Sequence, residues 1–459
     1  MIFSSVEYVG FLLAILVLLA LVRSLKAQKV ILLLGSYYFY ARWDWRFLAL
    51  LAGLSLSTYG CTKMIREGRD RKAWLIVSVA IALGTLGYFK YADFFIGTFI
   101  EVTGLHMGLL EVVLPVGISF IVFEVISYAV DVYRGEAEFE DSFLDFAVLV
   151  AFFPHLIAGP ILRPNHFLPQ LSRRVRITVP NLSAGAQLFV WGLMKKILVA
   201  DRLSQFVETV FNHPGAFSPA TTWLGVFAYA LQIYGDFSGY TDMAIGSARM
   251  MGFDLPQNFN LPYLAKNVTD FWRRWHISLS TWLRNYLYIP LGGNRRGVFR
   301  TYENLAIVML LGGLWHGANW NFCLWGGIHG LGLIVHRIFS NGKTEDSVGS
   351  FWITCGRGLT FLFVVVAWVP FRSLDWHGTL MIWEKMFGFL PGEQVRWVSV
   401  SLLYAVPCLI VADLGSRMWF NDKRLRLTRF THQLAFCLAA IGILVLAPPQ
   451  SSPFIYFRF

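Results

Sequence analysis

Long apolar runs that are nearly free of charge recur along the chain, separated by short polar stretches. About 18 such residues form a helix long enough to cross the ~30 Å hydrocarbon layer of a membrane. The pattern therefore predicts spans at 6–22, 74–89, 305–321, 322–340, 353–369, 398–414 and 432–448. The first run lacks a preceding basic stretch and a following small-residue cleavage site, so we interpret it as a span rather than a signal peptide.

The middle of the chain departs from this pattern. Residues 152–171 are apolar but contain four prolines, and proline frees backbone groups that need partners at membrane depth. We expect this segment to be re-entrant and buried by protein or beside a cavity. The segment 181–203 carries Lys195 and Lys196 in an apolar setting, which is typical of an interfacial helix with snorkelling lysines.

Composition and charge support a membrane protein. Of the 459 residues, 56% are hydrophobic and 15% charged, which is more apolar surface than a soluble fold of this length can bury. The net charge is +11, and the basic residues lie in short loops, mainly at 23–29, 63–72 and 173–176. This pattern predicts that these loops are cytoplasmic and that the N-terminus lies outside. No contiguous basic domain is present, so no nucleic-acid partner is expected.

No strong repeat or linker divides the chain, so we predict one integral-membrane domain over 1–459, with N-terminal spans in 1–135, a re-entrant and interfacial core in 140–300, and further spans in 303–459. The five cysteines show no Cys-x-x-Cys spacing, which argues against a zinc site or a disulfide framework. P-loop, zinc-protease and dinucleotide-binding motifs are absent from the sequence.

Polar residues inside this apolar frame are candidates for function, because an ionisable group in hydrocarbon is costly and tends to face a cavity or a partner. Three stretches contain such groups. They are 234–246, with Asp236 and Asp242; 271–297, with Arg273, Arg274, His276 and Arg284; and 312–330, with His316 and His329.

His316 is the strongest single candidate. Trp315 and a glycine flank it and Asn319 follows, which supplies an aromatic wall, a small neighbour and an amide partner. On one continuous helix His316 and His329 would lie ~20 Å apart along the axis and on nearly opposite faces. They do not share a reaction centre unless the nearby glycines break the helix. We interpret His329 as a packing residue.

Several long motifs follow one another in an order that resembles the membrane-bound O-acyltransferase superfamily: LPVGISF, FFPHLIAGPILRP, YGDFSGYTDMAIG, FWRRWHISLS, GLWHGANW, WVPFRS and FIYFRF. The resemblance is strongest to the bacterial branch that O-acetylates alginate, with teichoic acid D-alanylation proteins more distant. It implies an all-α bundle of about eleven membrane-spanning helices. Re-entrant and interfacial helices would complete two funnels that meet around a central histidine.

The resemblance also assigns roles. The superfamily's signature histidine falls on His316, and the second histidine of the alginate and teichoic acid branches falls on His276. A neutral imidazole takes the proton of a hydroxyl as it attacks an acyl carbonyl, so we expect His316 to be the general base. The oxyanion is stabilised by protonated His276, the Asn319 amide or backbone N–H groups. The supporting residues predicted are Asn319, Trp315, Asp236 and Arg273.

The expected donor is acetyl-CoA or a similar thioester on the cytoplasmic side, whose phosphates are met by Arg173, Arg174 and Arg176 or by Arg295 and Arg296. Neither a metal nor a tightly bound cofactor is expected. The resemblance implies that the acceptor would be an alginate- or cellulose-type exported polysaccharide, reached directly or through a periplasmic acetyltransferase partner within a synthesis and secretion complex. The protein would cross the inner membrane several times, with its C-terminus in the cytoplasm.

Two alternatives remain open at this point. One is the transfer of D-alanine or another acyl group to a different acceptor. The other is a polytopic transporter or flippase, which also places polar residues and broken helices at mid-membrane but is expected to show two halves with corresponding interruptions.

Overall fold

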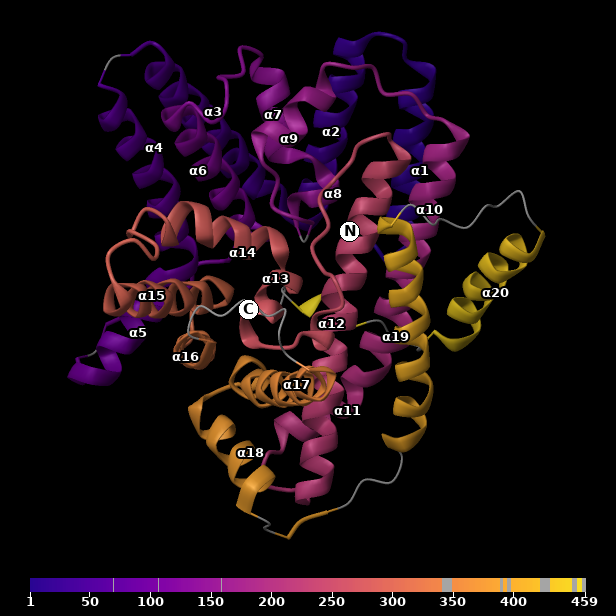
Figure 1. The fold of residues 1–459 in the computed structure, drawn as a ribbon. Helices are drawn as coiled ribbons and strands as arrows, with labels where there is room; N and C mark the ends of the chain where they lie inside the picture. Colours follow the sequence, from indigo (N-terminus) through magenta and orange to yellow (C-terminus); the bar gives the residue numbers. More distant parts are fainter. Residues whose placement is uncertain are drawn as a thin grey trace. The chain divides into compact units, whose positions relative to one another are not determined.

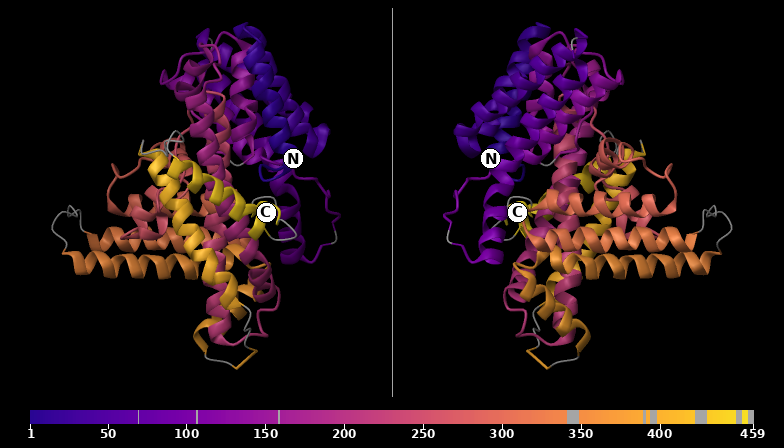
Figure 2. Two further views of the ribbon diagram at one scale, coloured as in Figure 1. Left: turned by 90° about the vertical axis from the view of Figure 1, so that its right-hand side faces the viewer. Right: turned by 90° about the vertical axis from the view of Figure 1, so that its left-hand side faces the viewer.

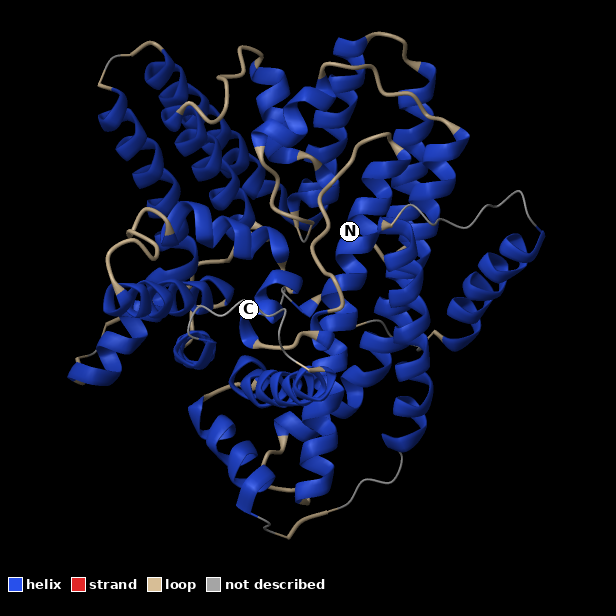
Figure 3. Ribbon diagram, in the orientation of Figure 1, coloured by secondary structure: helices blue, strands red, loops and turns tan. Residues whose placement is uncertain are grey.

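The computed structural model describes residues 1–68, 70–105, 107–157, 159–340, 349–388, 391–393, 398–421, 430–447 and 452–455. Over these residues the chain is helical and contains no strand, which confirms the all-α prediction (Figures 1 and 3). The chain forms two compact units. Unit 1 comprises 1–189 and 243–256, and unit 2 comprises 190–242 and 257–459. The single-domain organisation stays a prediction.

Some helices of unit 1 begin at a side-chain cap, and others end at a glycine. Ser5 caps the first helix by accepting a hydrogen bond from the Tyr8 N–H, and Gly135 ends the sixth in a left-handed conformation. The helices are α1 (Val6–Leu21), α2 (Leu25–Asp44), α3 (Leu48–Arg66), α4 (Arg71–Leu86), α5 (Ala92–Thr103), α6 (Ile118–Arg134), α7 (Phe143–Ala151), α8 (Phe153–Leu156), α9 (Pro164–Leu171) and most of α10 (Val179–Met194).

The break predicted around 152–171 is observed. Short helices α8 and α9 replace a continuous helix, and the backbone groups that are freed find partners inside unit 1. The Phe153 N–H donates to Ser36 Oγ at 3.0 Å, and the His155 ring bonds to the Leu149 carbonyl at 2.9 Å. This pairing is what a broken segment at membrane depth needs. That the segment is re-entrant stays a prediction.

Unit 2 holds the remaining helices. These are α11 (Asp201–Asn212), α12 (Pro219–Met250, which enters unit 1 at residue 243), α13 (Val268–Arg274), α14 (Ile277–Leu283), α15 (Val298–His316), α16 (Trp320–Ser340), α17 (Ser350–Arg372), α18 (Trp376–Gly388), α19 (Val398–Phe420) and α20 (Phe430–Leu446). Helices α16 and α17 lie side by side (Figure 2).

Six helical segments of the described chain are long and apolar enough to cross a membrane: 25–66, 71–103, 179–212, 320–340, 350–372 and 403–420. The protein is therefore a multi-pass membrane protein. Four of the predicted runs fall on these segments, whereas 6–22 corresponds to the shorter apolar helix α1 and 305–321 to α15. The run 432–448 overlaps α20, and its last residue lies outside the described chain.

The prediction that Lys195 and Lys196 snorkel to the membrane surface is wrong. Their exposed fractions are 2% and 1%, and both ammonium groups form ion pairs inside unit 2. An isolated lysine in an apolar segment reaches for water because its charge is costly to bury. Here the carboxylates of other unit 2 helices compensate that charge, so the lysines stay in the interior.

Glycines let α15 and α16 approach backbone to backbone. A Cβ atom on Gly313 would collide with the Phe322 carbonyl oxygen, and one on Gly326 with the Met309 carbonyl oxygen. Such small residues allow the close crossings on which helix association in membranes depends. This crossing brings together the two helices that frame the 317–319 turn.

Gly326→Ala is expected to destabilise the protein by about 1–3 kcal/mol, because the added methyl group meets rigid backbone atoms. Thermal unfolding in detergent should show a midpoint lowered by several degrees. The control is Gly358→Ala in α17, where a Cβ meets no atom within 4 Å and alanine favours the helix. Equal midpoints for the two variants would contradict a close backbone crossing.

Candidate active site

The GLWHGANW motif forms a break between two helices. Helix α15 ends at His316, Gly317 is extended, and α16 begins at Trp320. A side chain at position 317 would collide with the Phe322 ring, so the turn needs glycine. His316 and His329 therefore lie on different helices. The sequence had left this open, because the nearby glycines could break the helix.

His316 lies in a pocket of aromatic rings. Its exposed fraction is 3%, and its ring centroid lies 5.0 Å from those of Trp315 and Trp325 and 5.2 Å from that of Phe371. All three contacts are edge-to-face, which holds the imidazole in one orientation. The predicted aromatic wall is present, and it has more members than Trp315 alone.

His276 sits in the turn between α13 and α14 with a left-handed backbone, at φ +43°. Its ring is fully buried. Asn258 Oδ1 lies 3.3 Å from His276 Nδ1 and accepts hydrogen bonds from the Ser278 N–H at 3.0 Å and Ser278 Oγ at 2.9 Å. Burial lowers the pKa of His276 to about 3, so this imidazole is neutral at physiological pH.

Trp315 joins the two imidazoles. Its ring centroid lies 5.0 Å from that of His316 and 6.0 Å from that of His276, and Phe237 packs against the far side of His276 at 4.7 Å. Three predicted residues from two separate stretches of the sequence thus form one cluster in unit 2. The cluster joins α15 to the α13–α14 turn.

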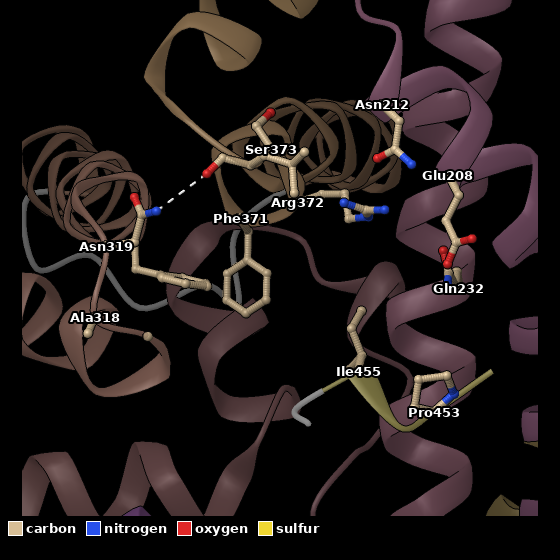
Figure 4. Close-up of a pocket in the computed structure, with 13 residues that line it drawn as sticks. Glu208, Asn212, Gln232, Ala318, Asn319, Phe371, Arg372, Ser373, Pro453 and Ile455 are labelled. Carbon is tan, nitrogen blue, oxygen red and sulfur yellow. Dashed lines mark hydrogen bonds between the residues drawn. The ribbon is translucent and has the colours of Figure 1, made fainter. Parts of the chain in front are cut away.

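A cavity of about 540 Å³ opens beside this cluster. Figure 4 shows Asn319 and Ser373 on one side and Glu208, Asn212 and Gln232 on the other. Phe371 lines the cavity and also contacts the His316 ring. The polar lining is rich in amide and carboxylate groups, which are suited to binding hydroxyl groups. His316 itself is not one of the lining residues, and Phe371 provides the contact between its ring and the cavity.

Asp236 contributes to this site at a distance. Its Oδ1 forms an ion pair with Lys196 Nζ at 2.8 Å, and its Oδ2 accepts the Ile455 N–H at 2.7 Å. Lys196 Nζ also donates to the Ser452 carbonyl at 2.8 Å. Because Pro453 and Ile455 line the cavity, the ion pair fixes the end of the described chain as one of its walls.

The other predicted residues are placed as follows. The Asn319 amide lines the cavity and donates to the Leu374 carbonyl at 3.4 Å. Arg273 is exposed at the end of α13. His329 is buried against Phe271 and Trp272 at 5.9 and 5.2 Å, in keeping with a packing role. No group of His, Cys, Asp or Glu side chains fit to hold a metal occurs in the part of the chain that the structure describes.

Sequence reasoning missed several residues of the site, such as Glu208 and Gln232 in the cavity and Trp325 beside His316. Asn258 orients the His276 turn, and Phe371 and Arg372 line the cavity. Phe371 and Arg372 belong to the WVPFRS motif. The motif marked them as family residues, but the sequence did not show where they lie in the fold. Asn258 had only a weak signal, the polar run QNFN after a proline.

Comparison with known proteins identifies the family. Residues 140–369 match the model of the membrane-bound O-acyltransferase family. A probable alginate O-acetylase from Pseudomonas putida is 40% identical, over the full length of both chains. The chain belongs to the membrane-bound O-acyltransferase family. The matched region includes His276, Trp315, His316 and Trp325. As a member of this family, the protein is an enzyme.

Two further relatives of this O-acyltransferase carry other names. A peptidoglycan O-acetyltransferase from Helicobacter pylori is 33% identical over 98% of the chain and 95% of its own length. A teichoic acid D-alanyltransferase from Streptococcus thermophilus is 28% identical over 48% of the chain and 56% of its own. The more similar relatives are named for the transfer of acetyl groups.

Proposed function

We propose that this O-acyltransferase moves an acetyl group from a cytoplasmic thioester, acetyl-CoA or a close analogue, to the outside of the inner membrane for O-acetylation of an exported polysaccharide. The observation that carries the proposal is the juxtaposition of His316 with a polar cavity in unit 2. The polysaccharide is of the alginate or cellulose type, and the transfer is direct or proceeds through a periplasmic acetyltransferase partner.

His316 acts as the general base in this proposal. The acceptor hydroxyl oxygen forms a bond to the acyl carbon while its proton passes to the imidazole. The carbon–sulfur bond then breaks, and the leaving thiolate takes the proton from the His316 imidazolium, which restores the neutral base. The aromatic rings around His316 exclude water, which protects the thioester from hydrolysis.

Phe371 controls access to the base. Its ring lines the cavity and contacts the imidazole, so this side chain would have to move for the two to be connected. An acceptor in the cavity would be held by amide groups such as those of Asn319 and Gln232. Reaction would then follow only when an acceptor displaces the ring.

His276 supports the reaction as a neutral ring rather than as an imidazolium. Its low pKa disfavours the protonated form, and the single N–H of the neutral ring faces Asn258 Oδ1, which leaves Nε2 as a hydrogen-bond acceptor. An oxyanion would therefore be met by the Asn319 amide or by backbone N–H groups. Trp315 fixes the two histidine rings relative to each other through its ring contacts. Asp236 has a positioning role, through the chain segment that lines the cavity.

Acetyl transfer is favoured over D-alanyl transfer because the relatives named for acetylation match over nearly the whole chain, whereas the D-alanyltransferase matches about half. In this proposal the fold has about eleven spans and two funnels around His316. The N-terminus lies outside and the C-terminus in the cytoplasm, with the basic loops inside.

Inverted inner-membrane vesicles that contain this protein are expected to move radiolabelled acetyl from external acetyl-CoA into polysaccharide in the lumen. His276→Asn should lower the rate about 10–100-fold, since asparagine tolerates the left-handed backbone but removes the imidazole. The exposed His377 supplies the control variant, His377→Asn. Vesicles without the protein that label the polymer equally well would refute the function.

A further inference from the structure

We infer that unit 1 contains a binding site for a phosphate group at the segment 173–176. Three arginine side chains line a cavity of about 710 Å³ there, together with polar groups from α9 and the start of α10. A second cavity of about 430 Å³ shares Arg174 and Arg176 and adds Arg23. Arg174 and Arg176 therefore line two adjoining cavities, and Arg173 lines the larger one.

Glutamine side chains hold the walls of this site rigidly. Gln28 is buried and clamps residue 175, with its Nε2 donating to the Val175 carbonyl and its Oε1 accepting the Val175 N–H, both at 3.0 Å. Gln170 clamps Asp254 on the opposite wall in the same way, at 3.0 and 2.8 Å. The arginines thus project from a fixed backbone, which lowers the entropic cost of binding a ligand.

The charge of the site is not compensated within the described part of the chain. Its one lining carboxylate, Asp254, forms an ion pair with Arg249. No described acidic side chain pairs with Arg173 or Arg176, and Arg174 donates only to the Arg23 carbonyl, at 3.1 Å. Unpaired guanidinium groups in a hollow are suited to an anion that accepts several hydrogen bonds.

The N-terminus of α10 contributes only its dipole. Thr178 and Asn181 line the cavity where this helix begins, but Pro180 has no N–H and the Asn181 N–H already donates to Thr178 Oγ1 at 3.3 Å. The positive end of the dipole still favours an anion there. The arginines therefore carry the argument for a phosphate ester.

Two sources carry that chemistry: a soluble nucleotide-type donor and the headgroup of an anionic phospholipid. The soluble donor would deepen the proposed function, because it names the chemical class of the donor, a phosphorylated thioester. This interpretation rests on the proposed function. The segment follows the positive-inside pattern, so the site would face the cytoplasm, where such donors are found. The alternative pair Arg295 and Arg296 supplies a matched control.

The test is a titration of the full-length protein in nanodiscs of phosphatidylcholine with adenosine 3′,5′-bisphosphate, followed by calorimetry. The double variant Arg173→Gln, Arg176→Gln should weaken bisphosphate binding at least tenfold. Arg174 is left unchanged because it donates a hydrogen bond to the Arg23 carbonyl. Arg295→Gln combined with Arg296→Gln should change bisphosphate binding less than twofold. Binding should weaken as ionic strength rises.

A second arm measures phosphatidylglycerol retained by the purified protein, with native mass spectrometry. Bisphosphate binding that the double variant loses supports a soluble donor, and loss of phosphatidylglycerol alone supports a lipid headgroup. If the wild type binds neither probe, or the double variant binds both unchanged, the site does not exist. Neither arm measures acetyl transfer. The binding result therefore tests the phosphate site even if the proposed acetyl-transfer function is refuted.

Discussion

Replacement of His316 by alanine is expected to abolish polysaccharide acetylation while the protein still accumulates in the membrane. General-base catalysis contributes about 10²–10⁴-fold to a rate, and alanine has no group to accept the hydroxyl proton. The aromatic rings that surround the imidazole are held by their own contacts, among them Trp325 on Trp368 at 5.6 Å, so the fold should survive. Acetyl ester content of the exported polymer, measured by NMR, is the readout.

His377→Ala is the matched control, because this histidine is exposed and lies outside the cluster. Its acetyl content should equal that of the wild type. Accumulation of both variants is compared by immunoblot of membrane fractions. Wild-type acetylation by a strain that carries only the His316→Ala protein would remove His316 from the mechanism and, with it, the role proposed for the cavity.

The second large effect concerns stability. Lys195→Met should destabilise unit 2 by about 3–5 kcal/mol, the usual cost of leaving a buried ion-pair partner uncompensated. Lys195 Nζ lies 3.0 Å from Asp242 and 2.8 Å from Asp413, and all three side chains are largely buried. Without the ammonium group, two carboxylates face each other in the interior. A lower thermal midpoint and reduced accumulation in the membrane are the measurements.

Neutralising the partners separates charge from packing. Lys195→Met combined with Asp242→Asn and Asp413→Asn should recover much of the lost stability, since no uncompensated charge then remains. Lys26→Met replaces an exposed lysine and should leave the midpoint unchanged. If the triple variant were no more stable than Lys195→Met alone, the network would contribute through its shape rather than its charge.

The two lysines illustrate how far sequence reasoning extends. The apolar context of 181–203 indicates a helix, which the structure confirms, but it suggests exposed ammonium groups. Asp201, a partner of Lys196, is close in the sequence. The other partners come from helices further along the chain, such as Asp413, which Lys195 contacts. A local pattern carries no information about which distant side chain arrives, so the burial of these charges was not predictable.

The histidines show the same division. The spacing of residues 312–330 and the family motifs select His316 and His276 without a structure. The ring of Trp315 that contacts both, the amide of Asn258 that orients His276, and the cavity behind Phe371 depend on packing between helices. The aromatic and polar side chains of these elements are ordinary in the sequence and gain a role only through position.

The sequence by itself determined that this protein is helical, lies in a membrane and is interrupted at a proline-rich segment, because hydropathy and proline chemistry act over a few turns of backbone. It also determined the family, because ordered motifs persist along the chain. Only the tertiary structure decided which charges are paired in the interior, which rings enclose His316 and where cavities open, because these depend on contacts between residues that are distant in the sequence.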